Sequence, residues 1–540
     1  MILLWLILIP DLVLAQQLRD PLSTTQSSAA FAEPRQTIAP VTIVNRAQDA
    51  TVDGQADGAD LLIGAVSVTG SEPIGLATLS ASYEPFIGRT ASPEVLQQLA
   101  RSVAEESRRR GYLFASAVVP AQAVQLGVVK VRLDLGAIDE VRITGSENRR
   151  LRQIFDRLIG KAPLKSHVER QLLLAEDLPG ITILGTRYEK KDGRGVLAVE
   201  VDDQKLSTFV VLDNYGPTSV GPLRVRLSTD VNGLFNAGDT LNAQILNTVH
   251  QPDELTFVSG RYAVTPGGGA SQFGVTASAG VSRPGGDLSR FELEGRSLYA
   301  AVFVSRALVR TKDASVWVNA ELAHLKFKEK AAGVLLQRDE IVTVSAGASG
   351  NVRIAKSQLS GGVGIVRGVA ASGTNRRGDP LSSRLDASGV FTKGTVWVNW
   401  TAPLGERYRI RASVNGQTTS RPLLASQEIG VGGPGFGRAY DFSERFGDRG
   451  VMGAIELRKE LGDGTPLARD VQIYTVVDGG SVGNIGQGFG GGSVYSAGAG
   501  ARGRIGRADF AVEVAAPLNA DRFRTADRSP RVNVSVRWRF

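Results

Sequence analysis

The chain has 540 residues, which exceeds one ordinary domain and predicts two or three folded units. It contains 63 glycines and no cysteine, so disulfides and thiol chemistry are excluded. Its 62 basic and 54 acidic residues leave a net charge of +8, and the basic residues alternate along the chain instead of forming blocks. This composition favours a glycine-rich β protein and argues against nucleic-acid binding.

The N-terminus carries an export signal by its pattern. Residues 2 to 14 are almost wholly apolar, and the small-residue pattern that precedes Gln16 predicts a signal peptide over residues 1 to 15. Residues 16 to 60 are polar and interrupted by prolines, so we expect a linker or arm. No later run of the sequence approaches about 18 uninterrupted apolar residues, so a membrane location would require a barrel.

Residues 61 to 136 predict a small α+β module. Its helix begins at the Ser92 cap with Pro93 in the first position, and Gly111 lies just past its end. Val95, Leu99 and Val103 lie at helical spacing, while Val129, Val131 and Leu133 alternate along a strand. We expect strands at 65–70, 114–119 and 128–135.

Residues 137 to 204 repeat this plan as a second module. A capping box formed by Ser166 and Glu169 predicts the start of its second helix. The other elements are expected at 140–144 (strand), 149–158 (helix), 181–188 (strand) and 195–201 (strand).

Residues 205 to 540 read as a large sheet of two-faced strands. In the last ten residues Val532, Val534, Val536, Trp538 and Phe540 alternate with polar and cationic residues, and residues 407 to 415 alternate arginines with apolar groups. A soluble core could not hold so many unpaired charges, whereas a barrel presents them to a wet lumen. At about 20 residues per strand and connection there is room for about 16 strands. The tryptophans Trp317, Trp397, Trp400 and Trp538 are expected at the membrane interface.

Several short motifs resemble one family when taken in order. They are Gly111-Tyr112, Pro120-Ala121-Gln122, Leu135-Gly136-Ala137-Ile138, Asp177-Leu178-Pro179-Gly180 and Asp213-Asn214-Tyr215-Gly216. Together they resemble the two-partner secretion transporters of the Gram-negative outer membrane, the TpsB family of the haemolysin secretion/activation type. The resemblance implies a mainly β fold, in which a 16-stranded transmembrane β-barrel is preceded by two α+β POTRA domains in the periplasm.

The same resemblance implies the partners. They are a secreted TpsA-type protein cargo, the lipid of the outer membrane, and the barrel-assembly machinery that inserts the chain. No cofactor and no nucleic acid are implied.

The densest motif is the glycine-rich stretch from Gly432 to Tyr440, which continues to Gly447-Asp448-Arg449-Gly450 and Glu456-Leu457-Arg458. Its glycines suit a long loop folded back inside a pore. A flexible external loop is the alternative. The tip Gly437-Arg438-Ala439-Tyr440 resembles the inward loop of the family, written V/I-R-G-Y/F, with Gly437 and Ala439 as departures. The resemblance implies that Arg438 pairs with an acid on a barrel strand, which matches Asp478 here. The alternative for Asp478 is an ordinary turn before two glycines.

Two further functions are expected from the pattern. The first module would bind exported cargo by strand addition along an exposed edge at Val128 to Leu135, with Val95, Leu99, Val103, Val129, Val131 and Leu133 as the binding residues. Trp538 and Phe540 would lie in the strand that closes the barrel and directs its assembly.

The sequence offers no support for catalysis or a metal site. His167, His250 and His324 are isolated, and no serine lies in a nucleophile elbow. Three rival classes remain at this point. A barrel-assembly protein would differ in the number of POTRA domains, a passive porin would lack the α+β modules, and a soluble adhesin or β-sandwich would lack a lipid-facing band.

Overall fold

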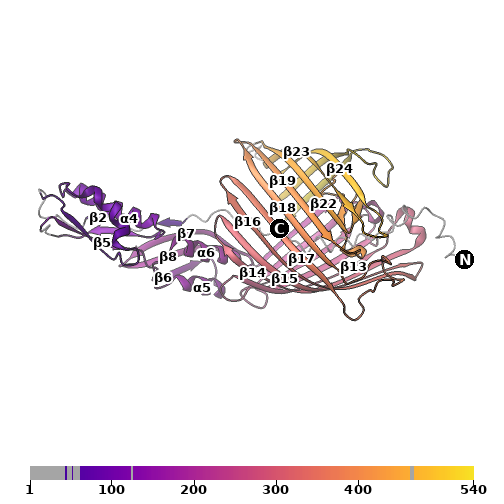
Figure 1. Ribbon diagram of the computed structural model, residues 1–540, viewed down its shortest axis with the longest axis horizontal. Helices are drawn as coiled ribbons and strands as arrows, with labels where there is room; N and C mark the ends of the chain where they lie inside the picture. Colours follow the sequence, from indigo (N-terminus) through magenta and orange to yellow (C-terminus); the bar gives the residue numbers. More distant parts are fainter. Residues whose placement is uncertain (1–42, 46–50, 53–60, 123–125, 462–467) are drawn as a thin grey trace.

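The computed structural model describes residues 43–45, 51–52, 61–122, 126–461 and 468–540. The predicted signal peptide and most of the predicted arm lie outside the described residues. Figure 1 shows two small α+β modules in a row, in indigo and purple, that lead from the N-terminal part of the chain to one end of a large barrel. We call this the module end of the barrel, and the opposite end the distal end.

The first module is a four-stranded sheet covered by helices, with the strand order β2-β4-β5-β3. The Ser92 hydroxyl caps the long helix by accepting a hydrogen bond from Val95 N, and Pro93 is its first residue, as predicted. The helix Leu76–Tyr83 was not predicted. The elements are β2 (Thr51–Val52), β3 (Ala65–Thr69), α3 (Leu76–Tyr83), η1 (Glu84–Phe86), α4 (Pro93–Arg109), β4 (Ser116–Val119) and β5 (Val128–Asp134).

The second module repeats this arrangement with the strand order β1-β7-β8-β6. The predicted capping box is wrong, because the helix begins earlier, with Leu164 at its N-cap and Ser166 already in its first turn. The elements are β1 (Ile43–Asn45), β6 (Glu140–Thr144), α5 (Arg149–Phe155), η2 (Asp156–Leu158), α6 (Lys165–Glu176), β7 (Ile181–Lys191) and β8 (Arg194–Asp203).

The two modules share a packed interface. Phe114 of the first module belongs to the apolar core of the second, where its ring stacks on Tyr188 with centroids 4.1 Å apart. The backbone N–H of Lys165 also donates to Gly111 O at 2.7 Å. Stacked aromatic rings contribute stabilising free energy beyond that of burying their surface. The two modules are therefore packed against each other and not joined by the chain alone.

The third unit is a closed barrel of sixteen strands, which confirms the predicted number. The last strand pairs with the first over five residues, from Ser535 opposite Asp213 to Arg539 opposite Phe209. The C-terminal strand therefore closes the barrel, as predicted. In order around the barrel the strands are β10 (Arg224–Asn232), β11 (Asp239–Thr248), β12 (Leu255–Val264), β13 (Ser271–Ser282), β14 (Leu293–Arg310), β15 (Ala314–Ala331), β16 (Val334–Ile354), β17 (Ser357–Val369), β18 (Thr392–Leu404), β19 (Tyr408–Thr419), β22 (Arg449–Glu460), β23 (Ala468–Gly483), β24 (Gly492–Ile505), β25 (Ala508–Pro517), β26 (Arg531–Arg539) and β9 (Leu206–Asp213).

The barrel has an apolar outer face and a polar lumen. On β26, Val532 and Val534 are 51% and 37% exposed, whereas the alternate residue Asn533 is buried at 4%. Such a continuous exposed apolar band fits lipid contact. The tryptophans are divided between the faces. Trp400 and Trp538 are exposed with the outer set, whereas Trp317 lies beneath the Arg310 guanidinium and Trp397 shares the inner parity.

Three connections at the distal end matter for function. The first loop, residues 370–391, joins β17 to β18. The second, residues 420–448, joins β19 to β22 and contains η5 (Ala425–Gln427), β20 (Ile429–Val431) and β21 (Arg445–Gly447). The third, residues 484–491, joins β23 to β24. We name them the 370s loop, the pore loop and the 480s loop.

The remaining short 3-10 helices lie in connections of the barrel and are η3 (Thr218–Val220) and η4 (Gly286–Phe291). Within the part of the chain that the structure describes, no helix is long and apolar enough to cross a membrane.

Candidate functional site

The tip of the pore loop is fixed to the barrel wall by Arg438. Its guanidinium faces three carboxylates on three strands, with Glu513 on β25 at 2.6 Å and both Asp478 on β23 and Glu456 on β22 at 3.2 Å. The structure thus brings together Arg438 and Asp478, the two residues that the sequence pattern paired. Ion pairs in a confined lumen are weakly screened, so each contact is worth more than at an open surface.

Asp478 is well held for this purpose. Its side chain is 0% exposed, and its Oδ2 forms an ion pair with Arg438 Nε. Its Oδ1 accepts hydrogen bonds from the Ser496 hydroxyl and, at 3.4 Å, from the backbone N–H of Arg438. Because a buried carboxylate is costly without partners, this residue is positioned to receive the loop and not to begin a turn.

Two of the three acids were not predicted. Glu456 also accepts a hydrogen bond from Arg502 at 2.9 Å, and Glu513 accepts one from the Tyr474 hydroxyl at 2.9 Å. Both lie on the polar parity of their strands, and Glu456 also lies in the continuation of the glycine-rich motif, but neither was assigned to Arg438 from the sequence. Arg438 is therefore one member of a lumenal charge network that spans β22 to β25, which we call the tip network.

Tyr440 anchors the loop on its apolar side. The side chain is 0% exposed and packs in a cluster with Val431, Met452 and Val494, while its hydroxyl donates to Ala520 O at 2.9 Å. A loop that buries an aromatic ring and satisfies its hydroxyl is ordered. The alternative of a flexible external loop is therefore wrong.

The two departures from the family pattern fit this backbone. Gly437 has a φ of +83°, a conformation that a β-branched residue disfavours. Ala439 is 0% exposed and lies outside the positive-φ region, so a glycine is not required there. The tip thus reaches the wall through a turn at the position before the arginine.

The closing strand also holds the loop. Arg531 on β26 donates from Nη1 to Tyr440 O at 2.9 Å and pairs with Asp441 at 2.6 Å, and its Nη2 donates to Asn214 O at 3.2 Å. Asn214 directly follows β9, the first strand. The pore loop therefore contacts the barrel at the seam where its first and last strands meet.

The residues predicted to bind cargo in the first module lie in its core. Leu99, Val103, Val129 and Val131 are each 0% exposed, Leu133 is 4% exposed, and Val95 packs against the same cluster. In addition, β5 lies between β4 and β3, so the prediction of an exposed edge at 128–135 is wrong. In a small sheet the alternating apolar face packs against the helix of the same module, so these side chains are not available to a ligand. Among the described residues the edge strands of this sheet are β3 and β2.

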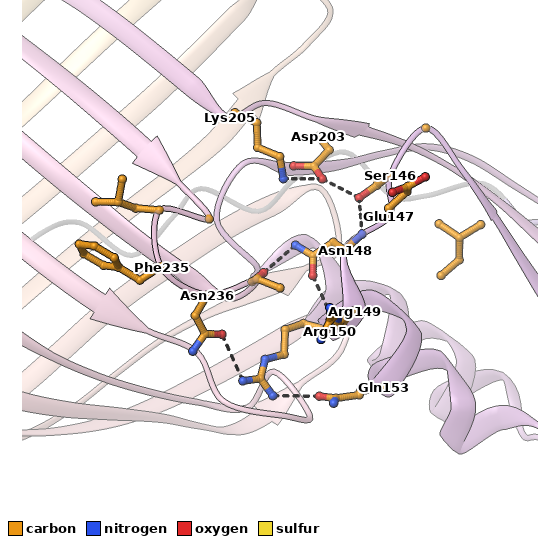
Figure 2. A pocket seen from close by; sticks show the side chains of 15 residues that line it. Ser146, Glu147, Asn148, Arg149, Arg150, Gln153, Asp203, Lys205, Phe235 and Asn236 are labelled. Carbon is orange, nitrogen blue, oxygen red and sulfur yellow. Dashed lines mark hydrogen bonds and ion pairs between the residues drawn. The ribbon is translucent and has the colours of Figure 1, made fainter.

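The second module sits on the barrel through the turn between β10 and β11. Figure 2 shows the cleft at this junction, where Asn148 and Arg150 point toward the turn. Asn148 Nδ2 donates to Ala237 O at 2.6 Å, and Arg150 Nη2 donates to Asn236 Oδ1 at 3.2 Å. The junction between the second module and the barrel is thus made of direct hydrogen bonds.

A buried ion pair completes the junction. Arg310 at the end of β14 binds Asp177 with two hydrogen bonds of 2.8 and 2.9 Å, and its side chain is only 5% exposed. The neighbouring Glu176 is 2% exposed, and its burial raises the pKa of this carboxyl to about 7, with Arg310 opposing the shift. The Asp177 motif therefore serves to join the second module to the barrel.

Comparison with known proteins decides the family. The model of the haemolysin secretion/activation protein family ShlB/FhaC/HecB matches residues 193–503, more than half of the chain, and that of the ShlB-type POTRA domain matches residues 61–136. The chain belongs to the haemolysin secretion/activation family. The resemblance seen in the sequence is thereby confirmed, and the first module is a POTRA domain.

Similar proteins include two curated transporters. The heme/hemopexin transporter protein HuxB of Haemophilus influenzae strain 86-028NP is 24% identical over 387 residues, covering 70% of this chain and 68% of that protein. The outer membrane transporter CdiB of Dickeya dadantii is 22% identical over 435 residues, covering 76% and 74%.

Solved structures share the fold. CdiB from Escherichia coli superposes with a TM-score of 0.70 at 18% identity, covering 98% of both chains. BamA from Haemophilus ducreyi lacking POTRA domains 1-3 gives 0.51 at 13% identity, covering 84% of this chain and 95% of that one. As a member of this family, the chain is an outer-membrane transporter of the two-partner secretion type that translocates a partner protein. A passive porin and a soluble adhesin are excluded by the same match.

Proposed function

We propose that the POTRA domains face the periplasm, capture the exported partner in an unfolded state and pass it through the barrel, while the tip network holds the pore loop in position for transport. The observation that carries this proposal is the position of Arg438. At the tip of a loop inside the barrel, its guanidinium contacts three carboxylates of the lumen wall. A chain that crosses the lumen must pass this loop, so its position governs the path.

Capture by the first POTRA domain uses a strand edge other than the one expected from the sequence. In the sheet order β2-β4-β5-β3, strand β3 (Ala65–Thr69) is an edge strand of the described residues. An extended cargo segment can add to such an edge through main-chain hydrogen bonds, which need no particular side chains. Transport requires no nucleotide in this scheme, because folding of the partner outside the cell biases its direction.

The contacts of the tip network are strong enough to hold the pore loop in one position and weak enough to let it move. A charge-assisted arginine-carboxylate hydrogen bond contributes about 1 to 3 kcal/mol, which shifts a loop equilibrium roughly tenfold or more without unfolding a barrel. We therefore propose that Arg438 and Asp478 act as one unit in secretion.

The test is a double-mutant cycle read out as secreted partner per folded barrel. Arg438→Ala and Asp478→Ala should each lower secretion about tenfold and leave the heat-modifiable barrel intact, and the double variant should be no worse than either single one. Arg421→Ala is the matched control, since this arginine lies exposed in the same loop. Fully additive losses, or native secretion from Arg438→Ala, would contradict the proposal.

Insertion into the membrane is the remaining step. We propose that the barrel-assembly machinery recognises the closing strand β26, which carries Trp538 near its end and is followed directly by Phe540. Both side chains are exposed, at 48% and 70%. An exposed aromatic pair at the end of an amphipathic strand fits lipid and an assembly partner.

A further inference from the structure

A second arginine forms a similar network at the distal end of the barrel. Arg384 lies in the 370s loop with its side chain only 6% exposed. Its Nη1 contacts Asp448 at 2.9 Å and Glu428 at 3.0 Å, its Nε contacts Asp386 at 3.2 Å, and its Nη2 donates to Ile485 O at 2.7 Å. One guanidinium thus faces three carboxylates and one carbonyl.

The partners of Arg384 come from three different loops. Asp386 lies in the 370s loop, Glu428 and Asp448 lie in the pore loop, and Ile485 lies in the 480s loop. Both pore-loop acids are close to where that loop leaves and rejoins the barrel, so they mark its root. We call this set the root network.

Asp448 is the centre of the root network. Its side chain is 0% exposed, and besides Arg384 it accepts backbone hydrogen bonds from Leu423 N at 2.6 Å and Ile485 N at 2.7 Å. A carboxylate with two backbone donors and an arginine is fully satisfied in a buried place. It ties the pore loop to the 480s loop directly and to the 370s loop through Arg384.

The 370s loop and the pore loop also pack on the barrel wall at β15 and β16 through apolar side chains. Ala387 and Phe391 of the 370s loop and Leu423 and Leu424 of the pore loop form one buried cluster with wall residues of β15 and β16, namely Leu325 and Ile341. The pore loop therefore contacts the barrel wall at two places, at β15 and β16 through Leu423 and Leu424 and at β22 to β25 through its tip.

We infer that Arg384 is a positioning residue that closes the distal end of the lumen, and that the exported chain leaves the barrel only when the root network opens. This inference rests on the proposed passage of the partner through the lumen. Removing the arginine leaves three carboxylates facing one another without their shared cation, and a buried charge that loses its partner is strongly destabilising. The loops would then separate while the strands of the barrel stay paired.

The first test is single-channel conductance of the full chain in planar lipid bilayers. Arg384→Ala should raise the open conductance severalfold, because three loops lose their common contact. Arg377→Ala is the control, since this arginine is exposed in the same loop, and it should behave as the native chain. A heat-modifiable barrel in both variants verifies folding. Native conductance from a folded Arg384→Ala barrel would overturn the inference.

The second test closes the network instead of opening it. Ser383 Oγ accepts a hydrogen bond from Ala425 N at 2.9 Å, and the chain has no native cysteine. The paired variant Ser383→Cys, Ala425→Cys should therefore allow a disulfide or a short thiol cross-link between the 370s loop and the pore loop. The linked protein should lose secretion, and reduction should restore it.

The outcomes separate this inference from the proposed function. Full secretion from the linked protein would refute the role of the root network, while a loss of secretion in Arg438→Ala would still support the tip network. Failure of the native lumen to conduct the partner at all would refute both.

Discussion

The tip and root networks use the same chemistry in two different ways. Each centres on one arginine that faces three carboxylates. The acids around Arg438 all lie on barrel strands, whereas those around Arg384 all lie on loops. The tip network therefore fixes a loop to the barrel wall, and the root network fixes three loops to one another. A similar set of side chains can thus set the position of a loop or close an exit, depending on what carries the acids.

The largest effect is expected from a deletion that opens the barrel wall on which both networks depend. Deletion of Val536 to Phe540 takes away four of the five residue pairs that close β26 on β9. We expect no membrane insertion and the loss of both networks, because an open sheet edge cannot be satisfied in lipid. The measurement is heat-modifiable protein in outer-membrane fractions. Normal amounts of it after the deletion would show that the closing strand is not needed for assembly.

Lysine substitution sharpens the difference between the two networks. The acids around Arg438 each face a different nitrogen, whereas Glu428 and Asp448 converge on Nη1 of Arg384, with Asp386 on its Nε and Ile485 O on its Nη2. One ammonium can replace a single converging nitrogen but not a spread fork. Arg384→Lys should therefore keep the contacts to Glu428 and Asp448 and give a conductance between the native and Arg384→Ala values, while Arg438→Lys should lose most of the secretion that Arg438→Ala loses. Equal loss from both lysine variants, relative to their alanine counterparts, would mean that the geometry of the acids does not matter.

A smaller effect is expected at the buried Arg310, which joins the second module to the barrel. Beside the Arg310 pair with Asp177, burial raises the pKa of Glu176 from 4.5 to about 7. The folded state therefore binds the proton of Glu176 more tightly than the unfolded state does. The contribution of this residue to the free energy of unfolding is fully present below pH 4.5 and is lost as the pH rises through 7. Above pH 7 the ionised carboxylate costs at most about 3 kcal/mol.

Glu176→Gln removes this cost. The thermal midpoint of the module transition in the detergent-solubilised chain should rise at pH 8 and change little at pH 5. Glu169→Gln on the same helix is the control, because its carboxylate is only weakly paired, 4.0 Å from Lys165. An equal gain at both pH values would show that Glu176 does not titrate in this range.

The sequence predicted the fold well where a pattern repeats along the strand or helix. Alternation identified the barrel strands, and the Ser92 cap identified α4. The helix Leu76–Tyr83 was missed because Leu76, Leu79 and Tyr83 are its only large apolar residues and the residues between them are alanines, serines and a threonine. Val129 and Val131 were assigned to cargo binding because alternation reveals an apolar face but not what covers it.

The site was predictable only in part for a similar reason. Arg438 stands out by its glycine-rich surroundings, and Asp478 interrupts an apolar strand. Glu456 and Glu513 look like ordinary lumen residues, and only the register of four strands brings them to Arg438. Arg384 lies in a loop without periodicity, and three of its four partners are 44, 64 and 101 residues away along the chain. Contacts of that range depend on closure of the barrel and not on local pattern.

The central claim is that the partner passes through the lumen, and adjacent residues of one strand test it directly. Asn399 on β18 lies on the inner face, where its Oδ1 accepts a hydrogen bond from Arg411, whereas Val398 lies on the outer face and is 37% exposed. A photo-cross-linking amino acid placed at either position during active secretion should trap the exported partner only from position 399. Trapping from position 398 alone, or from neither position while secretion continues, would contradict passage through the barrel.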